Sequence, residues 1–232
     1  VSIMAANTPE LFEAHNSVPM TGGVINTINT RLDVRTVAYI LDHSDCKVFI
    51  VDRQFQKVAS EALAQVDREI KDFEWVRPKD EWQAISLSYT SGTTGNPKGV
   101  VYHHRGSYLM SMGSVSAWNM PNRLTYLYTV PMFHCNGWGY PWTLAMLHAR
   151  VVFVRNIIVK DIFDLIDKYE VTHFGGAPIV LNMIANAPPE DQKLLKNKIY
   201  VMTAGAPPPS SILQKMESLG FEVMHVYGLT ET

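Results

Sequence analysis

The sequence predicts an α/β protein with a layered βαβ architecture and largely parallel sheets. Three observations support this fold class. Short runs rich in β-branched and aromatic residues alternate with helical patterns along the chain. The longest apolar runs, such as 151–154, have the length of a strand and fall far short of the ~18 residues of a membrane span. The 232 residues, 47% of them hydrophobic, are enough to bury a sizeable core.

The first part of the chain contains two helix start signals. Thr8 is a capping residue and Pro9 follows at the first helical position. Asp33 precedes apolar side chains that recur three and four residues apart. We therefore predict strands at 1–5, 24–25 and 47–51, helices that begin at residues 9 and 34, and a charged amphipathic helix at 56–70.

The rest of the chain continues the same alternation after a polar stretch at 77–83. That stretch is the best candidate for a boundary, and it divides the chain into a partial first subdomain at 1–76 and a second subdomain at 84–232. The predicted strands are 84–89, 100–102, 125–130, 151–154, 172–174, 199–203 and 222–226. The predicted helices are 105–117, 137–148, 161–169, 177–186 and 209–219.

Charge and cysteine content narrow the class of partner and compartment. Lys and Arg total 20 and Asp and Glu total 22, a net charge of −2, and no basic stripe is visible. Nucleic acid is therefore not the expected partner. Cys46 and Cys135 lie far apart without metal-ligand spacing, which suits a reducing compartment and predicts a cytoplasmic protein. The oligomeric state stays open, a homodimer included.

The segment 90–99 carries the clearest chemical signal. It holds four hydroxyl side chains, three glycines and one lysine within ten residues. Glycines allow close backbone approach to a ligand, while N–H groups, hydroxyls and a lysine bind anions, so the segment suits a polyphosphate. A Walker A loop is the alternative, but Pro97 and Gly99 occupy the positions of its second glycine and its metal-binding hydroxyl, and a strand is predicted where that loop opens a helix.

Residues 89–100, YTSGTTGNPKGV, closely resemble the signature loop of the adenylate-forming (AMP-binding) superfamily. Residues 203–208 and 227–232 resemble the adenine-binding turn and the next nucleotide motif of that superfamily, in the order it requires. Residues 23–32 are typical of its acyl-CoA synthetase branch. The acyl-binding segment looks most like that of ligases for medium-chain fatty acids or methylmercaptopropionate.

The resemblance implies an enzyme of fatty acid metabolism that converts a carboxylic acid and ATP into an acyl-adenylate and pyrophosphate, then transfers the acyl group to coenzyme A. Mg²⁺ is the implied metal, held by Glu231, and Thr230 is expected at the α-phosphate. Lys98, His134, Thr230 and Glu231 are the implied catalytic residues. The implied phosphate-binding residues are Thr90, Ser91, Gly92, Thr93, Thr94, Gly95 and Lys98, and the implied adenine-binding residues are Gly205, Ala206, Pro207, Tyr227 and Gly228.

The resemblance also places an acyl pocket, formed by His134, Trp138, Gly175 and Gly176. His134 stands where relatives that bind amino acids carry an Asp, so an α-amino acid is disfavoured because its ammonium group would lack a partner. The bulk of Trp138 favours a short- or medium-chain acid. Taken singly, His134 could also be a hydrogen-bonded core histidine, and Tyr227 a core aromatic at a strand end.

The motif order predicts the incomplete large N-terminal domain of an adenylate-forming enzyme, without the C-terminal lid domain of the family. We expect such a piece to bind nucleotide weakly and to turn over poorly on its own. Two alternatives stay open. One is a truncated, non-catalytic relative that binds only nucleotide or a partner, and the other is a P-loop nucleotide hydrolase.

Overall fold

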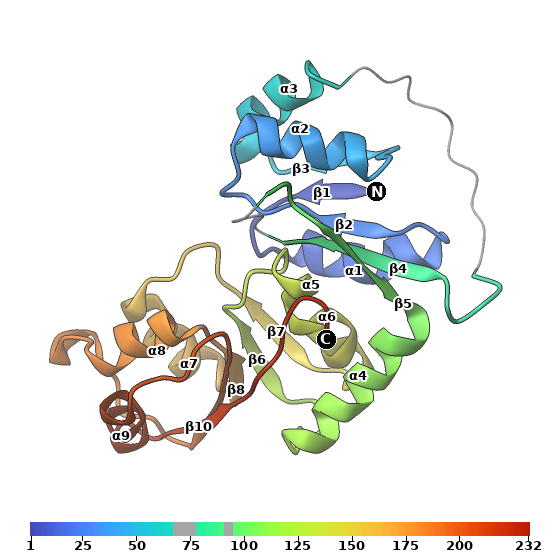
Figure 1. The fold of residues 1–232 in the computed structure, drawn as a ribbon. Helices are drawn as coiled ribbons and strands as arrows, with labels where there is room; N and C mark the ends of the chain where they lie inside the picture. Colours follow the sequence, from blue (N-terminus) through green and yellow to red (C-terminus); the bar gives the residue numbers. More distant parts are fainter. Residues whose placement is uncertain (67–77, 91–94) are drawn as a thin grey trace. The chain divides into compact units, whose positions relative to one another are not determined.

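The structure, a computed structural model, describes residues 1–66, 78–90 and 95–232. It confirms the α/β fold class, with two five-stranded sheets formed by the described residues (Figure 1). The chain divides into two compact units. The first comprises Val1–Met112 and Pro131–Trp142, and the second comprises Gly113–Val130 and Thr143–Thr232.

The sheet of the first unit has the strand order β3-β1-β2-β4-β5. Neighbouring strands run parallel except β4 and β5, which form an antiparallel pair. The chain therefore reverses direction across the glycine- and hydroxyl-rich segment between these two strands. The strands are β1 (Ser2–Met4), β2 (Ile25–Thr27), β3 (Phe49–Val51), β4 (Ala84–Tyr89) and β5 (Gly99–His103).

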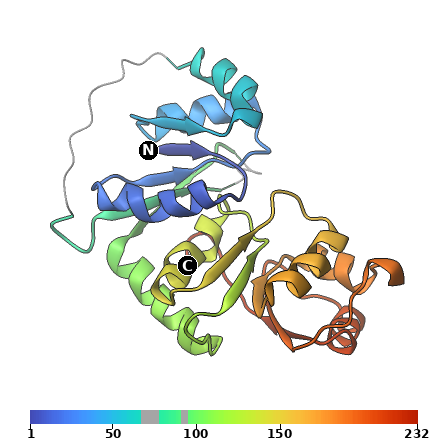
Figure 2. The ribbon, with the colours of Figure 1, turned by 180° about the vertical axis from the view of Figure 1, so that it is seen from behind.

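The helices of this sheet begin where the capping signals predict. The Thr8 hydroxyl accepts a hydrogen bond from the Leu11 N–H at the start of α1 (Pro9–Met20), and the Asp33 carboxylate accepts one from Thr36 N–H, at 2.8 Å, at the start of α2 (Val34–His43). These two helices cover opposite faces of the sheet (Figures 1 and 2). After the short 3₁₀ turn η1 (Arg53–Phe55), α3 (Gln56–Leu63) packs against α2.

The second unit contains an entirely parallel sheet with the strand order β10-β9-β8-β6-β7. Apolar side chains of the helices α7, α8 and α9 form one core cluster with the strands. Since all the strands are parallel, their carboxyl ends lie at one edge of the sheet. The elements are β6 (Thr125–Tyr128), β7 (Arg150–Phe153), α7 (Val159–Tyr169), β8 (His173–Gly175), α8 (Pro178–Ala185), η2 (Pro189–Asp191), β9 (Ile199–Thr203), α9 (Ser210–Ser218) and β10 (Phe221–His225).

A buried histidine lies within an aromatic cluster of this second unit. The ring of His173 stacks on Tyr200 with the ring centroids 5.0 Å apart, and it meets Trp118 edge-on at 5.1 Å. Burial lowers the pKa of His173 to about 4. His173 is therefore a neutral core residue at physiological pH.

The boundary between the two units differs from the one expected at 77–83. Residues 84–112 belong to the first unit, because β4 pairs with β2 and β5 pairs with β4. The division into 1–76 and 84–232 therefore separates strands that share one sheet. Strand pairing is a long-range property that the local polar composition of 77–83 does not report.

Two predicted helices also differ from the structure. The helix expected at 137–148 is replaced by α5 (Cys135–Trp138) and α6 (Tyr140–Met146), because the residues of α5 and the following Gly139 adopt left-handed backbone angles. The helix expected at 56–70 ends at Leu63, and residues 67–70 lie outside the described part of the chain. Among the helices that the structure describes, α4 (His104–Ala117) included, none is long and apolar enough to cross a membrane.

Candidate functional site

The carboxyl edge of the second sheet gathers the residues expected to bind adenine, the α-phosphate and Mg²⁺. Strand β9 ends at Thr203, immediately before the adenine-binding turn, and β10 ends at His225, immediately before the 227–232 motif. Thr203 and His225 are direct partners in the parallel pair, and the Val226 N–H donates to the Thr203 carbonyl at 2.9 Å. The two nucleotide motifs therefore leave the sheet side by side.

The turn expected to bind adenine, 203–208, is open on the side of Gly205. Gly205 adopts φ +99°, a conformation that favours glycine, and a Cβ added there would meet no atom within 4 Å. Gly205, Ala206 and Pro207 are all exposed. The turn therefore offers backbone and small apolar groups, with open space beside them.

The 227–232 motif is similarly open. Tyr227 is 85% exposed, which contradicts the core-aromatic alternative for this residue. Gly228 and Glu231 are also exposed, and the Thr232 hydroxyl accepts from the Leu229 N–H at 2.8 Å, which closes a turn over the end of the motif. The aromatic face and the carboxylate are thus available to a ligand.

The chemistry of the donor set fits Mg²⁺ bound together with phosphate. No group of three or more His, Cys, Asp or Glu side chains that could hold a metal occurs among residues 1–66, 78–90 and 95–232. Mg²⁺ is commonly held by one or two carboxylates together with substrate phosphates and water, so the single carboxylate of Glu231 suits this mode.

Two residues expected to line the acyl pocket lie at the same edge of the second sheet. Gly175 ends β8 and pairs with Met202 of β9, and the Gly176 N–H donates to the Met202 carbonyl at 2.8 Å. The Thr129 hydroxyl, just beyond β6, donates to the Gly175 carbonyl. Gly175 and Gly176 are buried, and the structure brings them beside the adenine-binding turn.

The segment expected to bind phosphate, 90–99, lies in the first unit. The Thr90 N–H donates to the Lys98 carbonyl at 3.0 Å, and the Lys98 N–H donates to the Thr90 hydroxyl at 3.1 Å, so these two residues close the base of the loop. Gly95 and the side chain of Lys98 are exposed. Strand β5 begins at Gly99, directly after Lys98, which contradicts a Walker A loop. The expected ligands Ser91, Gly92, Thr93 and Thr94 lie outside the described residues.

A tyrosine immediately before this loop makes contacts that the sequence did not indicate. The Tyr89 hydroxyl lies 2.8 Å from His43 Nδ1, and His43 stacks on Tyr39 with the ring centroids 5.2 Å apart. Burial, with a smaller contribution from Tyr39, raises the pKa of Tyr89 to about 12. Tyr89 therefore stays a neutral hydrogen-bonding group that ties β4 to α2.

In the segment expected to bind the acid, 131–138, the backbone from Cys135 onward forms a left-handed turn that ends at Gly139. The φ angles of Cys135, Asn136, Gly137, Trp138 and Gly139 are 45°, 42°, 58°, 59° and 70°. A left-handed conformation costs a residue that is not glycine about 1–2 kcal/mol, and three of the five residues are of this kind. Strain of this kind persists only where the surrounding contacts fix it, and it is concentrated at functional sites.

His134 is exposed at the entrance to this turn, which contradicts the core-histidine alternative. Its Nε2 lies 4.0 Å from the Cys135 sulfur. This contact with the Cys135 side chain raises the pKa of His134, and partial burial opposes the shift. Trp138 is half-buried at the other end of the turn. His134 and Trp138, the two residues of the first unit that are expected to line the acyl pocket, therefore lie at the two ends of one strained turn.

A buried histidine supports the segment that contains this turn. His15 of α1 is fully buried, and its Nδ1 lies 2.8 Å from the Leu11 carbonyl. Trp142, just beyond the turn, donates its indole N–H to the His15 carbonyl at 2.8 Å. Burial lowers the pKa of His15 to about 4, although hydrogen bonds to the backbone of Leu11 and Met132 oppose the shift.

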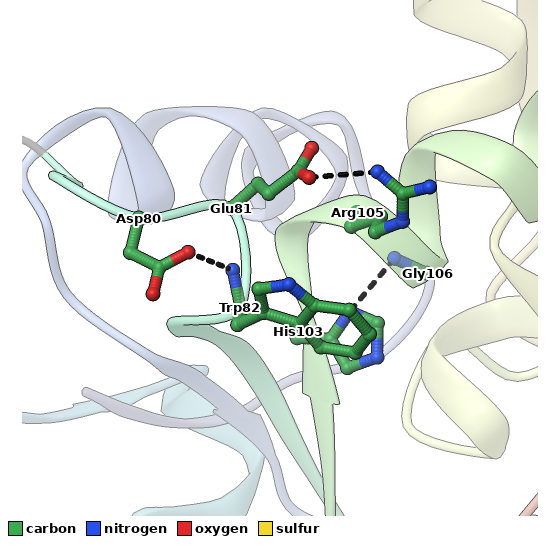
Figure 3. A network of polar contacts seen from close by, with 6 residues as sticks. All are labelled: Asp80, Glu81, Trp82, His103, Arg105 and Gly106. Carbon is green, nitrogen blue, oxygen red and sulfur yellow. Dashed lines mark hydrogen bonds and ion pairs between the residues drawn. The ribbon is translucent and has the colours of Figure 1, made fainter.

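The opposite end of the β4–β5 hairpin is held by a polar and aromatic network (Figure 3). The His103 ring lies 4.6 Å from that of Trp82 and accepts from the Gly106 N–H at 2.8 Å. Arg105 forms an ion pair with Glu81 at 2.7 Å. These contacts join residues before β4 to residues at and after the end of β5, so they fix the base of the hairpin whose other end is the phosphate-binding loop.

Comparison with known proteins agrees with these motifs. A family model described as AMP-binding enzyme matches residues 1–232. The chain is 43% identical over 274 residues to an acetate/butyrate–CoA ligase, named as peroxisomal, from Arabidopsis thaliana. It is 42% identical over 268 residues to a 2-methylpropanoate–CoA ligase from Humulus lupulus. Each match covers 100% of this chain and 48% of the relative, so the chain spans about half the length of these curated relatives.

Solved structures share the fold. The N-terminal domain of FACL13 from Mycobacterium tuberculosis matches with a TM-score of 0.85 and 25% identity, over 99% of this chain and 62% of that chain. An o-succinylbenzoate coenzyme A synthetase from Bacillus subtilis, solved in complex with ATP and magnesium ion, matches with a TM-score of 0.82 and 24% identity, over 99% of this chain and 49% of that chain.

Proposed function

Because the chain belongs to the AMP-binding enzyme family, we propose that it provides the nucleotide-binding and acid-binding part of an acyl-CoA synthetase. In the proposed reaction a carboxylate oxygen of the acid attacks the α-phosphorus of ATP, and pyrophosphate leaves. The thiol sulfur of coenzyme A then attacks the acyl carbonyl carbon, the thiol proton is lost, and AMP leaves.

The observation that supports this proposal most strongly is the convergence at the carboxyl edge of the second sheet. The adenine-binding turn at 203–208, the motif at 227–232 and the glycines at 175–176 follow three neighbouring parallel strands. Ligands of open parallel sheets bind outside the carboxyl ends of the strands. The adenine, the α-phosphate and the part of the acid near Gly175 and Gly176 would therefore lie at one edge.

The proposed roles follow from exposure and chemistry. Lys98 supplies an exposed positive charge to the β- and γ-phosphates, together with Thr90 and Gly95 and with residues 91–94. Tyr227 lies against the adenine ring, with Gly205, Ala206, Pro207 and Gly228 beside it. Thr230 contacts the α-phosphate. Glu231 holds Mg²⁺, which offsets phosphate charge when bound.

For the acid, we propose a short- or medium-chain carboxylate, with His134 and Trp138 as its candidate ligands in the first unit and Gly175 and Gly176 as those in the second. The curated relatives support the short end of this range, because their names specify acetate, butyrate and 2-methylpropanoate. His134 would hold the carboxylate. Its exposure and its raised pKa favour the cationic imidazolium that attracts an anion.

A cytoplasmic location and a homodimer remain further proposals. Neither Cys46 nor Cys135 is in a disulfide, which suits a reducing compartment, although the Arabidopsis relative is named as peroxisomal. Microscopy of a tagged chain checks the location, and light scattering on the purified protein checks the mass.

The test, in the full-length protein, is pyrophosphate exchange into ATP with acetate, butyrate, 2-methylpropanoate and octanoate, together with calorimetric binding of Mg·ATP. Lys98→Ala and Glu231→Ala should each lower the exchange rate on the order of 10²–10³-fold, because each removes preorganised charge at the phosphates. The matched controls Lys57→Ala and Glu217→Ala remove exposed charges elsewhere and should leave the rate unchanged.

Three results would contradict the proposal or one of its assigned roles. Unchanged exchange in Lys98→Ala or Glu231→Ala would remove the role of that residue. Binding of Mg·ATP without carboxylate-dependent exchange would favour the non-catalytic relative. Phosphate release that needs no carboxylate would favour a nucleotide hydrolase.

A further inference from the structure

The strained turn Cys135–Gly139 is built around a buried asparagine. Asn136 is fully buried, with φ 42° and ψ 51°. Asparagine tolerates this backbone conformation better than most residues, which explains a turn asparagine but not its burial. Burying an amide is unfavourable unless its polar atoms are hydrogen-bonded, so the contacts of the side chain matter.

Both polar atoms of the Asn136 amide have partners on the first sheet. The Ser88 hydroxyl donates to Asn136 Oδ1 at 2.6 Å, and Asn136 Nδ2 donates to the Thr27 hydroxyl at 3.1 Å. Thr27 is the last residue of β2, and Ser88 is the penultimate residue of β4. One side chain therefore joins the turn to the carboxyl ends of two neighbouring parallel strands.

These contacts connect the two parts of the candidate site that lie in the first unit: the start of the phosphate-binding segment and the turn that carries the candidate acid ligands. Ser88 precedes Thr90 by two residues, and Thr90 closes the base of the phosphate-binding loop. His134 precedes Asn136 by two residues and Trp138 follows it by two. The amide thus connects the start of the phosphate-binding segment to both side chains expected to contact the acid.

We propose that Asn136 is a positioning residue, which holds His134 and Trp138 at a fixed place relative to the start of the phosphate-binding loop. This inference rests on the proposed function and deepens it. Asn136 itself is enclosed and does not touch substrate. Its effect passes through the turn, because a turn of left-handed residues relaxes once its anchor is removed.

The substitution Asn136→Gly separates this role from a purely conformational one. Glycine adopts the left-handed region more readily than asparagine, so the backbone requirement stays satisfied while both hydrogen bonds disappear. Asn119 offers a matched control, because it also has a positive φ, 49°, but is exposed in the second unit. Asn119→Gly makes the same chemical change at the same kind of backbone position.

The first measurement needs no catalysis. The C2-proton resonance of His134, assigned with His134→Gln, is titrated by NMR in the whole chain. Contact with Cys135 raises the pKa of His134, so loss of the anchor should let the turn relax and return that pKa toward 6.5. Asn136→Gly should show this change, and Asn119→Gly should titrate like the unmodified chain. Far-UV circular dichroism and thermal unfolding verify that each variant is folded.

The second measurement is the carboxylate-dependent exchange reaction. Misplacement of a binding group by about 1 Å can cost on the order of 10²-fold, so kcat/KM for the acid should fall by about 10- to 100-fold in Asn136→Gly. KM for ATP should change much less, because the hydrogen bonds between Thr90 and Lys98 that close the phosphate loop do not involve Asn136 and the residues proposed for adenine lie in the other unit. Ser88→Ala should produce a smaller change in the same direction. The double variant with Ser88→Ala and Asn136→Gly should lose less kcat/KM than the product of the two single losses, because both substitutions remove the same hydrogen bond.

A folded Asn136→Gly variant that matches Asn119→Gly in the His134 titration would overturn the proposal. Equal losses for the acid and for ATP would also overturn it, since they indicate general destabilisation. Should the full-length protein show no exchange with any acid, the proposed function fails, while the His134 titration still decides whether Asn136 positions the turn. Where Asn136→Gly does not fold, Ser88→Ala carries the same comparison.

Discussion

The buried His15, whose carbonyl accepts from Trp142 beside the segment proposed to bind the acid, should make the first unit sensitive to mild acid. His15 has a pKa of about 4 in the folded chain, against an ordinary value of 6.5, chiefly because it is fully buried. Its pKa is lowered by folding, so the unfolded chain binds the proton more tightly. The contribution of neutral His15 to the free energy of unfolding is therefore complete above pH 6.5. It is lost as the pH falls from about 6.5 toward 4.

The size of the effect follows from these two values. Between pH 7 and pH 5, proton binding by the unfolded chain should remove about 2 kcal/mol of the free energy of unfolding. His15→Gln replaces the ring N–H with an amide N–H, so the residue keeps a hydrogen-bond donor but no longer titrates. The difference in unfolding free energy between the unmodified chain and His15→Gln should therefore shrink by about 2 kcal/mol from pH 7 to pH 5.

Urea unfolding followed by tryptophan fluorescence at both pH values measures this difference. His148→Gln removes an exposed histidine and serves as the control, and His173→Gln tests the buried histidine of the second unit, which should behave in the same direction. A gap between the unmodified chain and His15→Gln that is equal at pH 7 and pH 5 would refute the reasoning.

Two further predictions concern the hairpin and the acid-binding turn. Gly106→Ala should destabilise the chain by about 1 kcal/mol, because its Cβ would lie 2.9 Å from the His103 ring and displace that ring from Trp82. Gly113→Ala in the same helix meets no atom within 4 Å and should instead stabilise by roughly 0.5–1 kcal/mol, so thermal unfolding that gives both variants the same sign would contradict the packing argument. Cys135→Ala removes the contact that raises the pKa of His134, so that pKa should fall toward 6.5 in an NMR titration; an unchanged titration would place the cause elsewhere.

Features whose signal is local could be predicted from the sequence alone. The helix starts at Thr8 and Asp33 follow from capping chemistry within one turn, and the structure shows both caps. The composition of 90–99 is a property of ten adjacent residues, which is why a phosphate-binding segment could be predicted before any fold was known. The alternation of strands and helices predicted the α/β class for the same reason.

Features that depend on partners far along the chain are visible only in the folded structure. Asn136 could be predicted only as a turn residue, through the Asn-Gly pair, because its partners Ser88 and Thr27 lie 48 and 109 positions away. The assignment of β4 and β5 to the first sheet likewise depends on pairing with β2, not on the polar stretch before them. Local sequence specifies which conformations are favourable, whereas burial and strand pairing select among them, and those contacts form only in the folded chain.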